Sequence, residues 1–339
     1  MTSSIGRAAI VVLPFLIIAV FWAMAVMERR MAGHPGDRGF FERNGISISI
    51  YLLAAIGIWI LLMIVLPQLY MVDYSFHPKL PAAQRGGEKD VYTLENYRYF
   101  IFGSTVRTDQ FNTLHLRAFF LTIGASIFIT ILNFAICYPI AYYMAQVAGP
   151  ARLRVLLLLL IIPYWVNEIL RAFALRVIFG TSGLINTGLT QLGVIDAPID
   201  FLGHDIALYT GLSYAYLLIM VFPLFNAIES LDKNQIEAAR DLGAPWWHIH
   251  LFVVMPFAKP GIASGCTLVF MLTAGALAAP LILGGPKSLW FTPIVYDRFY
   301  QAFNWNQGSA YAFILLLACI AFVLLVLKLF KVSLGEIAR

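Results

Sequence analysis

The chain has 339 residues, of which 60% are hydrophobic and 12% are charged, and its mean hydropathy is +0.80. A water-soluble domain needs more charged residues to cover its surface, so the composition excludes one and places the chain in a membrane. The formal net charge of +5 could suggest nucleic acid, but a basic excess in a membrane protein reflects its cytoplasmic loops, and we expect no nucleic acid as a partner.

Apolar windows of roughly 20 residues, the length that a transmembrane helix requires, recur along the chain. They lie near residues 8–27, 49–72, 113–146, 155–179, 206–228, 259–283 and 309–331. We therefore predict an all-α, polytopic bundle with about seven transmembrane helices.

The first window is predicted to be an additional N-terminal transmembrane helix, followed by a cytoplasmic loop that ends at residue 48. Arg29 and Arg30 come directly after the window and should hold its end in the cytoplasm. A cleaved signal peptide, with its cleavage site near residues 23–25, is the alternative.

Positive residues indicate which connections face the cytoplasm. They concentrate at 28–48, 147–154 and 229–258 and in the C-terminal tail. The connections at 73–112 and 180–205 are assigned to the outer side, and the second of these contains no Lys or Arg. We expect turns and a short amphipathic helix in the first, and short helices or a partly re-entrant element in the second.

The window at 113–146 is longer than one span requires. It is expected to be tilted, broken near Pro139 or extended into water at one end.

The next window contains two charged residues, Glu168 and Arg171. An ionised side chain at the centre of a membrane helix costs roughly 2.5–3.5 kcal/mol. One explanation is a structural ion pair, because residues three apart share a helix face. The other is a path for the solute, in which a carboxylate and aromatic faces attract an amine cation. The candidate residues of this path are Tyr164, Trp165, Asn167, Glu168, Arg171 and Tyr216. Arg176 is expected to extend to the membrane interface.

Residues 237–256, EAARDLGAPWWHIHLFVVMP, lie between two apolar windows on the predicted cytoplasmic side. Asp232 is a good N-cap for a first helix, and Gly243 suits the left-handed residue that ends one. Pro245 suits the first position of a second helix, which we expect to end at Pro256. The sequence therefore predicts two short helices that meet at a sharp bend.

The bend would expose Glu237, Arg240 and Asp241 beside an aromatic surface. The loop could fit a cleft in a partner protein. It could equally be an interfacial amphipathic helix with Trp246 and Trp247 at the lipid headgroups, and the residue pattern alone does not decide between the two.

The pattern of Glu237, Ala238, Ala239, Gly243 and the following VMP resembles the EAA loop of ABC importer permeases of the type I class. The resemblance extends from about residue 49 to the end and is strongest to the spermidine/putrescine group. It is carried further by TLENYRYF at 93–100, YPIAYYMA at 138–145, LGVID at 192–196 and LGGPKSLW at 283–290.

This resemblance implies a permease domain at 49–339, with a core of about six helices in addition to the N-terminal one, in a bacterial inner membrane. It implies that the loop at 229–258 couples the permease to an ATPase. The implied coupling residues are Glu237, Ala238, Ala239, Arg240, Asp241, Gly243, Pro245 and Pro256. The implied partners are a cytoplasmic ATPase dimer that binds ATP and Mg, a second permease subunit and a periplasmic solute-binding protein. The implied solute is a polyamine, with an opine, a phosphonate or another small organic compound as alternatives.

No motif in the sequence indicates covalent chemistry by this chain, so we expect neither an enzyme nor a bound cofactor. GGPKS at 284–288 lacks the spacing of a phosphate-binding loop. His248 and His250 would point to different faces of a helix, which argues against a metal site. A self-sufficient channel or secondary transporter, with Glu168 as its ion site, is the main alternative class, and an integral membrane enzyme is the third.

Overall fold

The computed structural model describes residues 46–332 except 82–83, 85 and 105–109. Every regular element in these ranges is a helix. The described chain divides into two units. One contains residues up to Arg98 together with Asn304–Ala310, and the other contains Tyr99–Phe303 and the residues from Tyr311 onward. The N-terminal helix predicted at 8–27 lies outside the described residues.

The first unit contains one long helix, formed by α3 (Ile46–Ile60), the π-helical turn η1 (Leu61–Val65) and α4 (Leu66–Ser75). The loop after it is held by the amide of Asn96, which donates hydrogen bonds to the carbonyl oxygens of Ser75 and His77, both at 2.9 Å. Asn96 belongs to the predicted short helix, which the structure confirms as α5 (Glu95–Phe102).

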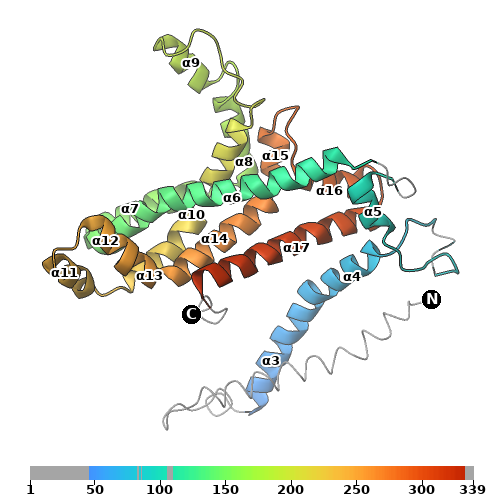
Figure 1. Ribbon diagram of the computed structural model, residues 1–339, viewed down its shortest axis with the longest axis horizontal. Coiled ribbons are helices and arrows are strands. Elements are labelled where there is room, and N and C mark those ends of the chain that lie inside the picture. Colours follow the sequence, from blue (N-terminus) through green and yellow to red (C-terminus); the bar gives the residue numbers. More distant parts are fainter. Residues whose placement is uncertain (1–45, 82–83, 85, 105–109, 333–339) are drawn as a thin grey trace. The chain divides into compact units, whose positions relative to one another are not determined.

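The second unit is organised around three helices that pack side by side, α6 (Thr113–Tyr142), α10 (Ile206–Glu229) and α14 (Lys259–Ala274) (Figure 1). Glycines allow α14 to approach α10 closely: a Cβ atom on Gly261 would lie 2.4 Å from the carbonyl oxygen of Pro223. Small residues are typical of membrane helix interfaces, because they let two backbones approach closely.

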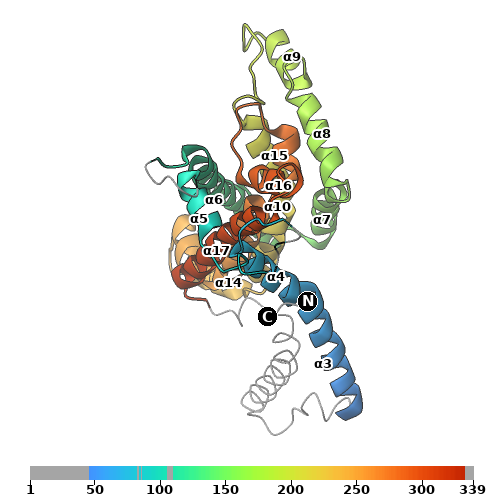
Figure 2. The same cartoon turned by 90° about the vertical axis from the view of Figure 1, so that its right-hand side faces the viewer.

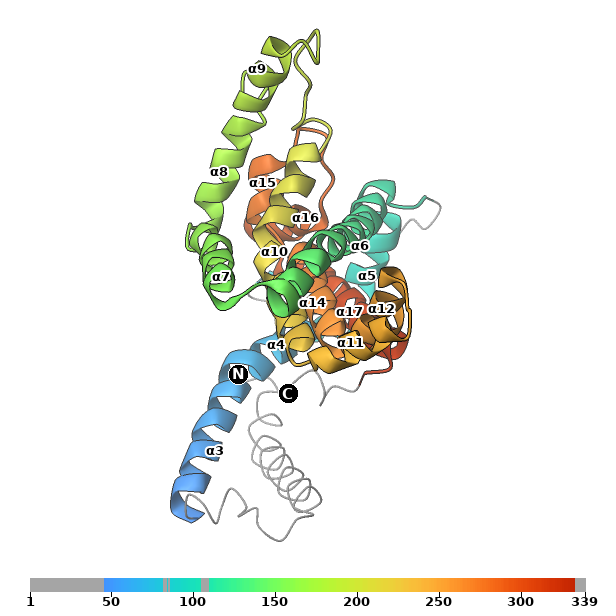
Figure 3. The ribbon, with the colours of Figure 1, turned by 90° about the vertical axis from the view of Figure 1, so that its left-hand side faces the viewer.

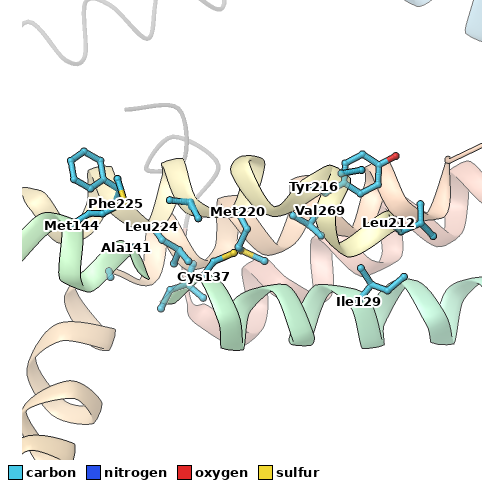
Figure 4. Close-up of a cluster of buried hydrophobic side chains, with 14 of the residues drawn as sticks. Ile129, Cys137, Ala141, Met144, Leu212, Tyr216, Met220, Leu224, Phe225 and Val269 are labelled. Carbon is cyan, nitrogen blue, oxygen red and sulfur yellow. The ribbon is translucent and has the colours of Figure 1, made fainter. Parts of the chain in front are cut away.

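The side chains between these helices are almost fully buried. Ile129 and Cys137 of α6 face Leu212 and Met220 of α10, and Val269 of α14 lies beside them (Figure 4). The buried amide of Asn133 donates to the carbonyl oxygen of Ser213 at 3.2 Å and accepts a bond from its hydroxyl. Apolar packing and internally satisfied polar groups therefore hold α6 against α10.

The remaining helices of this unit are connected to the three-helix core in chain order. They are η3 (Tyr143–Val147), α7 (Pro150–Tyr164), α8 (Glu168–Ile178), α9 (Leu184–Gln191), α11 (Lys233–Asp241), α12 (Trp246–Ile249), η4 (His250–Val254), α13 (Met255–Phe257), α15 (Ala278–Leu283), α16 (Phe291–Tyr300) and α17 (Trp305–Phe330), whose first residues belong to the other unit.

Four described helices are long and apolar enough to cross a membrane: Leu52–Ser75, Thr113–Val147, Ile206–Glu229 and Trp305–Phe330. Two bent helix pairs raise the number to as many as six. The helix at 113–147 continues through Pro139 and changes to π geometry only at Tyr143, so it is not broken at the proline.

Two predicted windows differ from the structure because hydropathy measures apolar length and not direction. The window at 155–179 is interrupted: α7 and α8 meet at 89°, and α8 extends away from α7 toward α9 (Figures 2 and 3). Pro163 lies in the last turn of α7, and the Asn167 side chain caps α8 by accepting a bond from the backbone N–H of Ile169 at 2.9 Å. The window at 259–283 is likewise divided, since α14 ends before Gly275 and α15 begins at Ala278.

Candidate functional site

The loop at 229–258 forms the predicted sharp bend. The Asp232 carboxylate caps α11 by accepting a bond from the backbone N–H of Asn234 at 3.0 Å. Gly243 follows α11 with a φ of +78°, which confirms the left-handed end of the first helix. The N–H groups of Gly243 and Ala244 return to the carbonyl oxygens of Arg240 and Ala239 at 2.9 and 3.1 Å. These bonds satisfy the last carbonyls of α11 and fix the bend.

The second half of the loop begins directly after Pro245 and runs through α12, η4 and α13. Pro256 does not end it, because a proline in the first turn of a helical segment breaks no hydrogen bond, and α13 continues to Phe257. At Ala258 the chain bends by 76° into α14. The predicted end at Pro256 is therefore one residue too early.

One face of the loop is buried and the other is open. Ile236, Ile249 and Val254 belong to the same buried cluster as α6 and α10. On the open face, Glu237, Ala238, Arg240 and Asp241 are exposed, whereas Ala239 is half-buried. The apolar residues of this face are also exposed: Leu242 by 88%, Trp246 by 74% and Trp247 by 50%. Leu242 is part of this surface although the sequence pattern gave it no role.

The predicted solute path is gathered around the break between α7 and α8. The guanidinium of Arg171 lies over the rings of Tyr164 and Tyr214, at 5.6 and 5.9 Å from their centres. Tyr216, on the same helix as Tyr214, is buried and lies close enough to Glu168, Arg171 and Tyr164 to interact with them electrostatically. Four candidates therefore meet at one place, together with Tyr214.

The other two candidates have different positions. Trp165 is 86% exposed, and Asn167 is used as the N-cap of α8. Sequence spacing suggested an ion pair between Glu168 and Arg171, but the described residues form ion pairs within 4.0 Å only at His77. The expected pair is absent because the guanidinium lies on tyrosine faces. Its buried Nε has no hydrogen-bond partner among the described residues.

Two other expectations change. Arg176 does not simply extend to the membrane interface, since it donates a hydrogen bond to the carbonyl oxygen of Ile282 near the end of α15. His250 was considered only as a metal ligand, yet its ring contacts Tyr138 and Tyr142 of α6. In the part of the chain that the structure describes, no three His, Cys, Asp or Glu side chains are grouped to hold a metal ion.

Residues 137–330 match the model of one protein family, described as the inner membrane component of binding-protein-dependent transport systems. The chain belongs to this family. It is the membrane-spanning permease subunit of an ABC importer, and its location is the inner membrane. The all-α permease fold predicted from the sequence is confirmed.

Curated relatives extend the similarity beyond the family segment. The chain is 32% identical over 260 residues to the spermidine/putrescine transport system permease protein PotB of Haemophilus influenzae, covering 76% of this chain and 85% of that protein. It is 33% identical over 253 residues to PotB of Escherichia coli K12, covering 74% and 86%. It is 26% identical over 242 residues to a putative 2-aminoethylphosphonate transport system permease protein, PhnU, of Salmonella paratyphi A, covering 70% and 80%.

Solved structures support the fold. A subunit of a bacterial ABC transporter that imports the acidic polysaccharide alginate superposes with a TM-score of 0.65, covering 86% of this chain and 96% of that one at 15% identity. A chain of the alginate transporter in complex with its alginate-bound periplasmic protein gives a TM-score of 0.66 at 14% identity, covering 87% and 98%.

Proposed function

We propose that this permease imports a small organic amine, with spermidine and putrescine as the first candidates, and that the loop at 229–258 couples import to ATP hydrolysis by a separate subunit. The partners in this proposal are a cytoplasmic ATPase dimer that carries ATP and Mg, a second permease subunit and a periplasmic solute-binding protein. The permease itself contributes the membrane path and the coupling surface.

The observation that carries the coupling role is the combination of a fixed bend with an open face. Hydrogen bonds fix the bend at Gly243, while the buried face packs into the core between α10 and α14. Exposed Glu237, Arg240 and Leu242 form a surface of mixed charge and apolar character. Such a rigid projection suits a groove on a partner, and a displacement of the projection would move the helices attached to it.

The solute assignment is supported by the 32–33% identity to PotB and by the residues at the α7–α8 break. Tyrosine rings attract organic cations through their faces, and an exposed carboxylate at Glu168 adds an opposite charge. The guanidinium of Arg171 already occupies two of these faces, so an ammonium group of the solute would compete with it.

A second candidate solute is an amine that also carries an anionic group, such as an aminophosphonate. The unpartnered Nε of Arg171 favours it, because a buried charged donor is stabilised by an acceptor. The similarity to PhnU points in the same direction.

The test is uptake into proteoliposomes that contain the purified importer with its own ATPase and solute-binding protein. Labelled putrescine, spermidine and 2-aminoethylphosphonate are supplied separately, with and without ATP. ATP-dependent uptake of a polyamine supports the first assignment. Uptake of the aminophosphonate alone would replace it with the second, and transport by the chain without any ATPase would overturn the importer mechanism.

A further inference from the structure

The end of α6 nearest the coupling loop makes polar contacts with two other parts of the chain. The hydroxyl of Tyr138 forms a hydrogen bond with Nδ1 of His250 at 2.8 Å, across 112 residues of sequence. One turn further along α6, the ring of Tyr142 meets the same imidazole edge to face, with the ring centres 4.4 Å apart. His250 is thus held by two tyrosines of one helix.

Gln146, one turn after Tyr142, connects α6 to the end of α10. Its amide nitrogen donates to the carbonyl oxygens of Ile228 and Leu231, at 2.7 and 3.2 Å. These carbonyls lie where α10 ends and the coupling loop begins, so they have no partners within a continuing helix. Gln146 therefore joins α6 to the start of the loop, while Tyr138 and Tyr142 join α6 to its second half.

The packing around these contacts is tight. Cys137, Ala141 and Met144, which alternate with the polar residues on α6, are at most 1% exposed. Ile249, the neighbour of His250, belongs to the same buried cluster. A close-packed contact transmits displacement, because interiors of this kind have low compressibility.

We propose that Tyr138 and His250 are positioning residues for coupling, which make the end of α6 move together with the loop at 229–258. This inference rests on the coupling role proposed above and adds α6 to the helices that follow the loop. The loop is covalently connected to α10 and α14, but it moves α6 only through non-covalent contacts, of which the Tyr138–His250 hydrogen bond has the longest sequence separation. Without this bond, ATP hydrolysis continues while the helices open less completely.

The experiment measures solute transported per ATP hydrolysed by the assembled importer in proteoliposomes. Tyr138→Phe removes one oxygen atom, and His250→Phe removes the ring nitrogen that meets it. Each variant is expected to lower the ratio about two- to tenfold, the range of one net hydrogen bond. The double variant is expected to be no worse than either single one, because both remove the same bond. His250→Asn, whose amide lies near the position of Nδ1, is expected to restore part of the ratio.

Two matched controls remain near the wild-type ratio. Tyr143→Phe changes an exposed tyrosine of the same helix, and His248→Asn changes an exposed histidine of the same loop. If His250→Phe fails to assemble, Tyr138→Phe decides alone. A wild-type ratio for Tyr138→Phe, or additive losses in the double variant, would overturn this inference. Failure of the coupling role itself is recognised separately, by a wild-type ratio when Gly243 is replaced with valine.

Discussion

Replacing Gly243 with valine tests the coupling role most directly, because the structure separates backbone strain from steric collision at this position. The φ of Gly243 is +78°, and a Cβ atom added there meets no atom within 4 Å. The cost of Gly243→Val is therefore conformational, roughly 1–2 kcal/mol for an L-residue in the left-handed region. An energy of this size lowers the population of the bent loop by a factor of about 5–30.

We expect Gly243→Val to abolish most ATP-driven uptake, while the amount of permease in the membrane stays unchanged. Uptake and ATP hydrolysis are measured together in proteoliposomes, and the permease is quantified by immunoblot. Gly243→Asn should lose less, since asparagine enters the left-handed region more readily. Gly149→Val is the matched control, because Gly149 is exposed with a φ of −70° and an added Cβ there also meets no atom within 4 Å. Full uptake by Gly243→Val would refute the coupling assignment.

Three further outcomes are expected. Glu237→Lys reverses an exposed charge on the open face of the loop, so less ATPase should be retained when the permease is purified in detergent; equal retention would exclude this face as the docking surface. Gly261→Val forces a Cβ against the carbonyl oxygen of Pro223 and should destabilise the α10–α14 contact by about 1–3 kcal/mol, seen as a lower melting temperature in detergent. Tyr164→Ala removes one aromatic face beside Arg171 and should raise the KM for the amine severalfold at unchanged membrane level, whereas an unchanged KM would remove Tyr164 from the solute path.

The coupling loop was predictable because its signals are local. An N-cap at Asp232, a glycine after the first helix and a proline before the second each act within a few residues, and the structure confirms all three. The family resemblance of the chain also depends on short stretches, and the family match confirmed it.

Features that depend on tertiary packing were not predictable from these signals. Spacing placed Glu168 and Arg171 on one helix face, but it could not show that Tyr214, from another helix, would offer its ring to the guanidinium. The contact between Tyr138 and His250 spans 112 residues, and nothing in either local pattern indicates the other. The break between α7 and α8 had local signals in Pro163 and Asn167, but the apolar window averaged over them.

The α10 helix provides the physical connection between the coupling loop and the proposed solute path. It has 24 residues and is therefore roughly 36 Å long. Tyr214 and Tyr216 lie toward its first half, beside Arg171, whereas Ile228 at its other end accepts the hydrogen bond from Gln146. A helix packed along its length against α6 and α14 moves as a body, so a displacement of the loop changes the position of both tyrosines relative to α8. The contact between Arg171 and Tyr214 joins α8 to α10 and must change whenever these two helices separate. Solute binding at the α7–α8 break and ATP-driven movement of the loop would then act on the same helix pair.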